Sequence, residues 1–396
     1  MNVSRRSLLS GSAVLAVSPV KAIAADQTLQ IQTAINKAIS GDGVLRLPSG
    51  KYYVTGLQVG ASLQIEGVAG KTILVGSAGA TILSADNAKR LTITGVTFDG
   101  GDNGLSLIQC GGKISNCEFR SQAKTALLAL DSTGLEISGN HVHDIGNNGV
   151  QVWTSDKKED GTIVTNNRVE RIAATDGGSG QYGNGINIYK AGNVLVSSNR
   201  VTDCAYSAIR NNSGSNCQIT GNSISRTEEV AIYVEFFFEG AVINNNMIDD
   251  VCFGISITNF NEGGRLAVCN GNLVRNVRNG ITNGVTTAGG IYAEADTLLS
   301  NNVVENAKDF GIGLGWGPYA RNLSALGNMI KDCDTGLRTS VTEGAGVSYI
   351  ANNTIIGSRL AAITGMDHLS PMTDDLGKAD AKVPDLVLLK DNIIRA

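Results

Sequence analysis

The sequence predicts an all-β protein in which the chain forms a single right-handed parallel β-helix of roughly twelve coils, each with three short strands. A repeat carries most of this prediction. Residues 208–212 (AIRNN) align with residues 231–235 (AIYVE), and two shorter apolar pieces lie between them. The composition agrees, because 49 Gly, 5 Pro and 42% hydrophobic but only 5% aromatic residues are typical of short Val, Ile and Leu strands joined by tight turns.

Residues 1–24 predict a signal peptide of the twin-arginine type. Arg5 and Arg6 precede a short apolar run, and an Ala-x-Ala site at 22–24 places the cleavage before Ala25. The run is too short to be a permanent membrane anchor. We therefore expect the twin-arginine translocation machinery to export the folded chain, which would then be periplasmic or secreted. A Sec signal peptide and a cytoplasmic start are the alternatives.

Residues 25–396 are expected to form one β-helix domain with a cap at each end. Residues 26–40 place apolar side chains at helical spacing up to Gly41, which predicts an amphipathic helix over the open edge of the first coil. Residues 366–396 begin with a polar stretch that contains Pro371 and Pro384. We expect this segment to leave the coil and to return as a last coil or cap.

A turn residue marks each coil. Gly95 takes this place in the first explicit coil, and the later coils carry an Asn, at positions 116, 140, 167, 199, 222, 246, 272, 302, 328 and 353. Asn tolerates left-handed backbone angles, and stacked Asn side chains can hydrogen-bond from coil to coil. The spacing does not fit the periods of leucine-rich repeats, β-propellers or hexapeptide helices.

The net charge, the cysteines and the histidines limit the possible partners, disulfides and metal sites. A formal net charge of −4 offers no basic surface, so neither nucleic acid nor an anionic membrane is an expected partner. The seven cysteines lack metal-type spacing and are interpreted as small buried hydrophobic residues, with one disulfide left open. His141 and His143 share one face of a strand and could bind a metal, but they lie away from the predicted groove, so we expect ordinary surface histidines.

One strand of each coil presents an unusual outer face. Alternation predicts that Ile186, Ile209 and Ile232 point inward and stack, while polar and aromatic residues point outward. The predicted outward residues are Gln151, Trp153, Asn187, Tyr189, Arg210, Asn212, Tyr233, Glu235, Ser256, Thr258, Tyr292, Glu294, Arg338 and Ser340, with Lys190 and Trp316 just past their strand ends. Long turns at 154–161, 173–183, 236–240 and 279–288 adjoin these strands, so we expect them to wall a groove.

Such a groove suits a sugar chain, because aromatic rings stack on the CH faces of sugars while amides and charges bind hydroxyl and uronate groups. The predicted partner is therefore a polysaccharide or oligosaccharide. The alternative is that these residues only decorate the surface of a long solenoid.

The segment with the helix, LPSGKYYV (47–54) and LQIEG (63–67), together with the Asn-turn repeat, resembles the pectin lyase-like superfamily. With the twin-arginine start, the chain also resembles an uncharacterised family of twin-arginine-translocated repeat proteins. The first resemblance implies a polysaccharide substrate. Lys190 and Arg210 on adjacent coils are similar to the Lys and Arg of the alginate and chondroitin lyases of this fold, and Ca²⁺ is the cofactor that the resemblance allows. Asn187 and Tyr189 stand where those enzymes carry an acidic calcium-binding pair.

The sequence thus predicts a lyase or epimerase that acts on an acidic polysaccharide. The predicted catalytic residues are Lys190, Arg210, Tyr233 and Glu235: the cations and the tyrosine serve as carboxylate clamp, base and acid, and Glu235 holds the cations or a metal. The predicted substrate-binding residues are Gln151, Trp153, Asn187, Tyr189, Asn212, Tyr292, Glu294, Trp316 and Arg338. Alternatives are an inverting glycoside hydrolase that uses Glu235 and Glu294, a non-catalytic glycan-binding or envelope-structural protein, and a surface Arg210–Glu235 pair without catalytic role.

Overall fold

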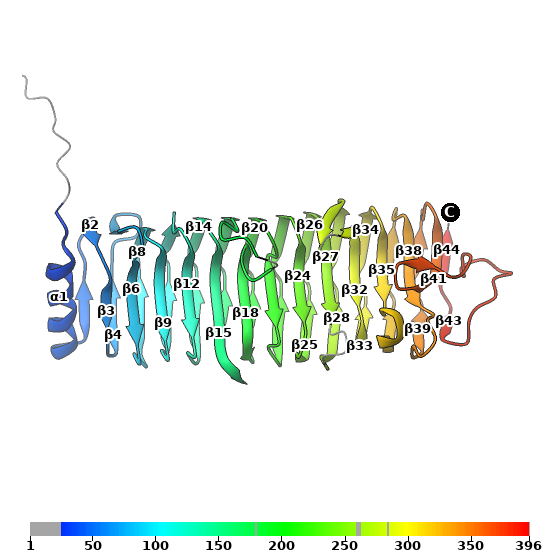
Figure 1. Cartoon of the computed structure of the whole chain (residues 1–396), viewed down its shortest axis with the longest axis horizontal. Helices are drawn as coiled ribbons and strands as arrows, with labels where there is room; N and C mark the ends of the chain where they lie inside the picture. The colour runs from blue at the N-terminus through cyan, green and yellow to red at the C-terminus, as the bar shows by residue number, and fades with distance from the viewer. Residues whose placement is uncertain (1–24, 179, 259–262, 283–284, 396) are drawn as a thin grey trace, which may run out of the picture.

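Three parallel sheets run along the length of the molecule, and each coil contributes one strand to each sheet (Figure 1). The computed structural model describes residues 25–178, 180–258, 263–282 and 285–395. The predicted signal peptide, residues 1–24, lies outside the described residues. Within them, each of the three sheets contains 14 strands, so that the first and last strands are about 62 Å apart at one strand spacing per coil.

Every strand of sheets A and B pairs in parallel with the strand of its own sheet in the next coil. Sheet A contains β1 (Val44–Arg46), β4 (Leu63–Glu66), β7 (Leu91–Thr94), β10 (Gly112–Ser115), β13 (Leu135–Ser138), β16 (Ile163–Thr165), β19 (Leu195–Ser197), β22 (Cys217–Thr220), β25 (Glu239–Asn244), β28 (Arg265–Asn270), β33 (Ala295–Ser300), β36 (Arg321–Leu326), β39 (Ser348–Ala351) and β43 (Val387–Lys390). Sheet B contains β2 (Gly50–Val54), β5 (Thr72–Gly76), β8 (Val96–Gly100), β11 (Glu118–Arg120), β14 (His141–Ile145), β17 (Arg168–Ile172), β20 (Arg200–Cys204), β23 (Ser223–Thr227), β26 (Met247–Val251), β29 (Leu273–Val277), β34 (Val303–Ala307), β37 (Met329–Lys331), β40 (Thr354–Ile356) and β44 (Ile393–Arg395).

Sheet C carries the candidate site and ends in a short antiparallel strand, β42. It contains β3 (Leu57–Val59), β6 (Thr81–Asp86), β9 (Asn103–Ile108), β12 (Thr125–Leu130), β15 (Asn148–Glu159), β18 (Asn184–Gly192), β21 (Ile209–Asn212), β24 (Val230–Glu235), β27 (Phe253–Thr258), β32 (Gly289–Ala293), β35 (Phe310–Leu314), β38 (Thr335–Ser340), β41 (Ala361–Asp367) and β42 (Ser370–Pro371). A 3₁₀ turn, η1 (Gly317–Tyr319), follows β35.

The interior is a continuous apolar core. Inward-facing Val, Ile and Leu side chains of all three sheets stack coil on coil, and the predicted column of Ile186, Ile209 and Ile232 is fully buried. All seven cysteines are buried and unpaired in the structure. No helix in the described part of the chain is long and apolar enough to cross a membrane.

The helix α1 (Thr28–Ser40) covers the first coil, as the sequence predicts (Figure 1). Its buried side chains are Ile31, Ile35 and Ala38. Gln32 binds the backbone N–H and C=O of Gln58 at 2.8 and 2.9 Å, and so pairs an edge of β3 that would otherwise be open. At the other end the chain leaves sheet C after β42 and returns as β43 and β44, the last strands of sheets A and B.

A ladder of buried Asn side chains lies at the turn between sheets A and B. Nδ2 of each Asn donates to Oδ1 of the Asn in the next coil at 2.9–3.0 Å. The members are Asn140, Asn167, Asn199, Asn222, Asn246, Asn272, Asn302, Asn328, Asn353 and Asn392. The side-chain amides thus satisfy one another's hydrogen-bonding groups at the buried turn between sheets A and B. The predicted hydrogen bonding from coil to coil is confirmed.

Two details of the predicted turn are wrong. Asn116 is level with Gly139 and lies one residue before the ladder position, where Cys117 donates its backbone N–H to Asn140 at 2.9 Å. The left-handed backbone also belongs to the residue before each ladder Asn, for example Gly139 (φ 66°) and Asn166 (φ 56°). The ladder Asn is therefore selected for its hydrogen bonds and its neighbour for the backbone angle.

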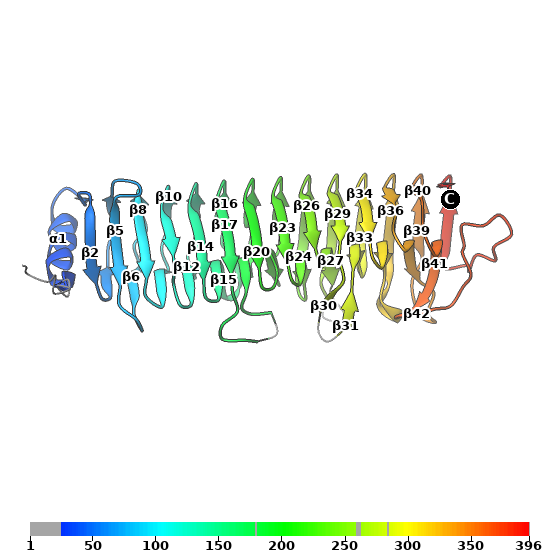
Figure 2. The same ribbon diagram turned by 90° about the horizontal axis from the view of Figure 1, so that it is seen from above.

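Two of the long segments project from the same side of the solenoid (Figure 2). One connects β17 to β18. The other contains the antiparallel hairpin of β30 (Gly280–Thr282) and β31 (Val285–Thr287). Both segments precede strands of sheet C. They therefore lie beside the sheet on which the sequence predicts the groove.

Candidate functional site

The site is built on the register of β15, β18, β21 and β24 in sheet C. Gln151, Asn187, Arg210 and Tyr233 are paired across the four strands, and so are Trp153, Tyr189, Asn212 and Glu235. These two rows lie two residues apart, which places them on one face of the sheet. The alignment predicted from the repeat is confirmed residue by residue.

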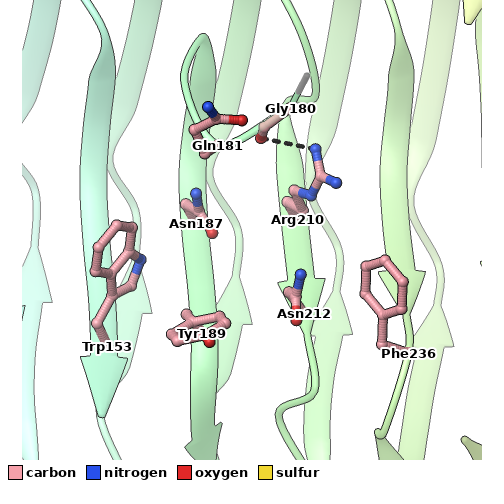
Figure 3. Close-up of a pocket in the computed structure, with 8 residues that line it drawn as sticks. All are labelled: Trp153, Gly180, Gln181, Asn187, Tyr189, Arg210, Asn212 and Phe236. Carbon is pink, nitrogen blue, oxygen red and sulfur yellow. Dashed lines mark hydrogen bonds between the residues drawn. The ribbon is translucent and has the colours of Figure 1, made fainter. Parts of the chain in front are cut away.

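A hollow of about 370 Å³ opens over these strands (Figure 3). Its lining residues are Trp153, Gly180, Gln181, Asn187, Tyr189, Arg210, Asn212 and Phe236. The rings of Trp153 and Tyr189 meet edge to face, with centroids 5.8 Å apart. Aromatic surface and amide groups therefore face the same open hollow.

Turns from both sides complete the hollow. The segment after β17 supplies Gly180 and Gln181, and the turn after β24 supplies Phe236 (φ 60°). The ammonium of Lys157, on the extended end of β15, donates to the carbonyl oxygen of Phe237 at 2.5 Å. The expected walls around this part of sheet C are thus present.

Arg210 lies at the base of the hollow and is held by the protein itself. Its Nε and Nη2 donate to the two carboxylate oxygens of Glu235 at 2.6 and 3.0 Å, and Nη1 donates to the carbonyl oxygen of Gly180 at 2.7 Å (Figure 3). Arg210 is 8% exposed and Glu235 2% exposed. The interpretation of this pair as a surface ion pair is therefore wrong, because both side chains are buried.

Two further ionisable groups surround the guanidinium. Glu229 lies 3.6 Å from Nη1 of Arg210, and Ser207 donates to the same carboxylate at 2.9 Å. Burial raises the pKa of Glu229, although Arg210 and Ser207 oppose the shift. Tyr233 places its ring 5.1 Å under the guanidinium, and burial together with Glu235 raises its pKa to about 12. Tyr233 therefore keeps its proton at neutral pH and is unsuited to act as a base.

Burial by itself lowers the pKa of Arg210, but Glu235 and Glu229 outweigh it, so the pKa is raised and the side chain stays charged. Its charge is balanced by Glu235, and its hydrogen bonds go to Glu235 and Gly180. Asn212 donates to Glu235 at 2.9 Å as well, so the Glu235 carboxylate contacts Arg210 and Asn212. The predicted carboxylate clamp and the predicted metal-holding glutamate are thus bound mainly to each other.

Lys190 lies at the rim, away from Arg210. Its ammonium donates to the carbonyl oxygen of Ser155 at 3.1 Å and lies 5.1 Å from the ring centroid of Tyr189. Asn187 is the residue of β18 that is level with Arg210, and Lys190 follows it by three residues, or about 10 Å along the strand. The two cations that the sequence pairs in one catalytic centre do not meet.

The remaining predicted residues separate into other environments. Gln151 is buried and accepts a hydrogen bond from Thr125 at 3.3 Å. Tyr292, Trp316 and Arg338 line a second, smaller hollow of about 50 Å³ further along the solenoid. Glu294 is fully buried, so a bound sugar cannot reach its carboxylate. The pair of Glu235 and Glu294 is therefore not placed to flank a glycosidic bond.

An aromatic cluster separates the two hollows. Tyr233, Phe253 and Phe310 are buried on the outer face of sheet C, and Tyr292 packs against them. The ring centroids of Phe253 and Phe310 are 6.0 Å apart, and those of Tyr292 and Phe310 are 6.4 Å apart. The expectation of one continuous groove is corrected by this finding, since the rings predicted to contact substrate pack on one another.

The sequence interpretation misses several residues of the site. Gly180 and Gln181 belong to a segment that it treats only as a wall, as does Phe236. Glu229 precedes β24 and falls outside the strand pattern altogether. The length of the segment before β18 is the signal that points to the first two, but a turn has no period from which its contacts can be predicted.

The repeat region of this chain matches a known family. The family model described as "Right handed beta helix region" matches residues 79–263 and, in an overlapping match, residues 148–316. This chain belongs to that family. Comparison with curated proteins gives no significant match.

The right-handed β-helix fold is also present in similar solved structures. The catalytic domain of a GH87 α-1,3-glucanase in complex with nigerose has a TM-score of 0.57 at 12% identity, with 91% of this chain and 66% of that chain covered. The Dettilon tailspike protein (gp208) has a TM-score of 0.51 at 15% identity, with 83% of this chain and 64% of that chain covered. An alginate lyase from Paenibacillus sp. has a TM-score of 0.49 at 15% identity, with coverages of 69% and 92%. At these identities the likeness to the glucanase domain and to the tailspike protein is one of fold.

Proposed function

We propose that this right-handed β-helix protein binds a polysaccharide and seats one segment of the chain in the hollow over β15, β18 and β21. One observation carries the proposal: aromatic rings from Trp153, Tyr189 and Phe236 surround one volume with the amides of Asn187 and Asn212. Sugar rings offer CH faces to aromatic side chains and hydroxyl groups to amides, which act as both donors and acceptors.

The amides are held in place before any ligand arrives. Asn212 donates to Glu235 at 2.9 Å and accepts from Ser213 at 2.8 Å, and Asn187 is 4% exposed. Such fixed groups lose little conformational freedom on binding. The similar fold of the GH87 α-1,3-glucanase catalytic domain, solved in complex with nigerose, supports a sugar ligand.

The choice between neutral and acidic sugars depends on Lys190. Arg210 is balanced by Glu235 inside the protein, whereas the Lys190 ammonium is partly exposed at the rim. We propose an acidic polysaccharide, whose uronate carboxylates would lie against Lys190. Lys190→Ala should then weaken uronate binding and leave the binding of neutral sugars unchanged.

A second candidate function is lyase or epimerase chemistry on the bound acidic chain. It is favoured by the buried cluster of Arg210, Glu229, Tyr233 and Glu235 directly beneath the hollow, because concentrated buried ionisable groups are typical of active sites. With its pKa raised to about 12, Tyr233 keeps its proton, so it is the member of the cluster that would serve as a weak acid, and Arg210 would position the cluster. Lys190 would be the base and would have to approach the substrate from the rim. A hydrolase that uses Glu235 and Glu294 is less well supported, because both carboxylates are buried.

Binding and turnover separate these candidates. A glycan array with the purified protein identifies the ligand, and calorimetry with Trp153→Ala and Tyr189→Ala should show affinity losses of roughly 3- to 10-fold each. Tyr53→Ala is the matched control, because Tyr53 is 37% exposed and Tyr189 36% exposed, but Tyr53 lies on β2 in the first coil. Equal affinities of Tyr189→Ala and Tyr53→Ala would contradict the proposed site.

The reaction products distinguish β-elimination, hydrolysis and epimerisation. Unsaturated sugar ends that absorb in the ultraviolet indicate β-elimination, new reducing ends without that absorbance indicate hydrolysis, and an inverted uronate indicates epimerisation. Binding without any of these products supports the first candidate, a glycan-binding protein. An absence of glycan binding would refute both.

We propose in addition that the chain is exported by the twin-arginine pathway and acts in the periplasm or outside the cell. The support is the segment with Arg5 and Arg6, a short apolar run and the Ala-x-Ala site at 22–24. An extracellular location would give the hollow access to polysaccharides of the cell surface or the medium.

A further inference from the structure

We propose that Glu118, His141 and His143, on the outer face of sheet B, form a binding site for a divalent transition metal ion, with Zn²⁺ as the best fit. This site lies on a different sheet from the glycan hollow, and it does not depend on the proposed function. The sequence interpretation treats the two histidines as ordinary surface residues, because their strand lies away from the predicted groove.

The register of β11 and β14 brings the three residues together. Glu118 pairs with His141 across the strands, and His143 follows His141 by two residues on the same face. One donor atom from each of the three side chains lies within 4.8 Å of the others. Two imidazoles and one carboxylate are the protein ligands of many catalytic zinc sites.

One contact already has the length that a zinc site requires. His143 Nε2 lies 3.2 Å from Glu118 Oε1, and ligands about 2.0 Å from a tetrahedral Zn²⁺ are about 3.3 Å apart. His141 is the member that has to move. Its side chain is 40% exposed and its ring lies 4.3 Å from that of His143, so a rotation about its side-chain bonds can complete the set.

His143 contacts a carboxylate at each ring nitrogen. Nδ1 lies 2.6 Å from Oδ2 of Asp144, and Nε2 faces Glu118. Nε2 and Oε1 of Glu118 lie 3.2 Å apart, so a cation placed between them would be bound by both atoms. Asp144 would then orient the ring in the way that carboxylates orient zinc-bound histidines.

Three arginines surround the proposed ligands. Arg171 binds Asp144 at 2.6 Å and lies 3.3 Å from Nδ1 of His143, the ring nitrogen that is not proposed as a ligand. Arg120 binds Asp99 at 2.9 Å and reaches Glu118 only at 3.4 Å. Glu170, which contacts His141 at 2.8 Å, is also held by Arg168 and therefore keeps a cation when His141 turns toward the metal.

There is room for an additional ligand beside the site. A surface hollow of about 310 Å³ is bordered by Glu118 and His141. Three protein ligands with an open position are the arrangement of catalytic rather than structural zinc sites. A water molecule or a small anionic ligand would complete the coordination.

The experiment uses the purified full chain after treatment with a chelator. Calorimetry with ZnCl₂ should show one site per chain, and CoCl₂ should produce visible absorption bands of tetrahedral intensity. His141→Gln, His143→Gln and Glu118→Gln should each weaken Zn²⁺ binding by more than about 100-fold, and Asp144→Asn by roughly 10-fold. His368→Gln is the matched control, because His368 is the third and last histidine of the chain and lies after β41.

Circular dichroism and melting temperature verify that each variant is folded. A chain that binds no Zn²⁺ at millimolar concentration would overturn the proposal. So would equal losses in His368→Gln and His143→Gln, or binding that persists in the His141→Gln/His143→Gln double variant.

Discussion

Arg210→Ala should be among the most destabilising single substitutions on the outer face of sheet C. In the native protein the carboxylate of Glu235 is 2% exposed and receives two hydrogen bonds from Arg210. The substitution leaves this carboxylate with Asn212 as its donor, and it also removes the cation next to Glu229. Breaking a buried pair in this way costs about 3–5 kcal/mol, because a buried charge is left uncompensated.

The chain contains a matched exposed pair. Arg226 binds Asp203 through Nε at 2.6 Å and Nη2 at 2.8 Å, the same two-point geometry, but the two side chains are 50% and 35% exposed. Water screens such a pair, so Arg226→Ala should lower the free energy of unfolding by no more than about 1 kcal/mol. The difference between the two variants isolates the effect of burial.

Urea denaturation followed by tryptophan fluorescence measures both variants, provided that the slope of the transition is unchanged. Replacing both partners, as Arg210→Met with Glu235→Leu, should recover most of the loss, since apolar residues need no counter-ion. If Arg210→Ala and Arg226→Ala were equally destabilising, the reasoning would be refuted. The same result decides how glycan assays are read, because loss of turnover in Arg210→Ala would also follow from loss of structure.

Three further predictions concern other features. Asn222→Ala removes two donated and two accepted hydrogen bonds to neighbouring coils and should lower the free energy of unfolding by about 2–6 kcal/mol. The control, Ser223→Ala, should change it by less than about 0.5 kcal/mol. Equal effects of the two substitutions would contradict the stabilising role of the ladder. Hydrogen bonds from a neighbouring lysine and serine lower the pKa of Asp131 to about 2, so its stabilisation is present above about pH 4 and is lost as the pH falls toward 2. Asp131→Asn should therefore flatten the acid side of the melting-temperature profile, and an unchanged profile would count against this. Arg5→Lys with Arg6→Lys should block export in cell fractionation, and unchanged export would indicate the Sec route.

The side chains that point inward from each strand could be predicted from the sequence, because a single packing constraint governs them. A side chain such as Ile209 must fill a core whose cross-section hardly changes, so apolar residues recur at the same place in every coil. That recurrence fixes which strands pair and in what register. The pairs of Arg210 with Asn187 and with Tyr233 follow directly from it.

The same register could have identified the metal ligands. Glu118 lies 23 residues before His141, which is one coil period, so the repeat places the two side by side. The sequence interpretation applied the register to the groove strands, the turn residues and the cysteines, but not to Glu118 and the two histidines. A pair of histidines is weak as a signal, but a carboxylate one period earlier makes a group of three ligands.

The exposure of the side chains that point outward could not be predicted in the same way. A residue that points away from the core is exposed only if no turn covers it, and Arg210 is covered because Gly180 accepts its hydrogen bond from a segment with no repeat. Likewise, Tyr233 and Tyr292 point outward as predicted, but Tyr233 is buried and both pack with Phe253 and Phe310. Exposure on this fold depends on turn conformation, which the sequence pattern does not encode.

This separation explains how one solenoid can carry two unrelated sites. The core and the Asn ladder stabilise the coil from inside, so the outer faces of sheets B and C vary without changing the strand register. The hollow with Trp153 and the cluster with His143 lie on different sheets and share no residue. Substitutions in one should therefore add independently to those in the other, as expected for sites without common partners. An observed coupling would require the two faces to communicate through a core that is otherwise uniformly packed.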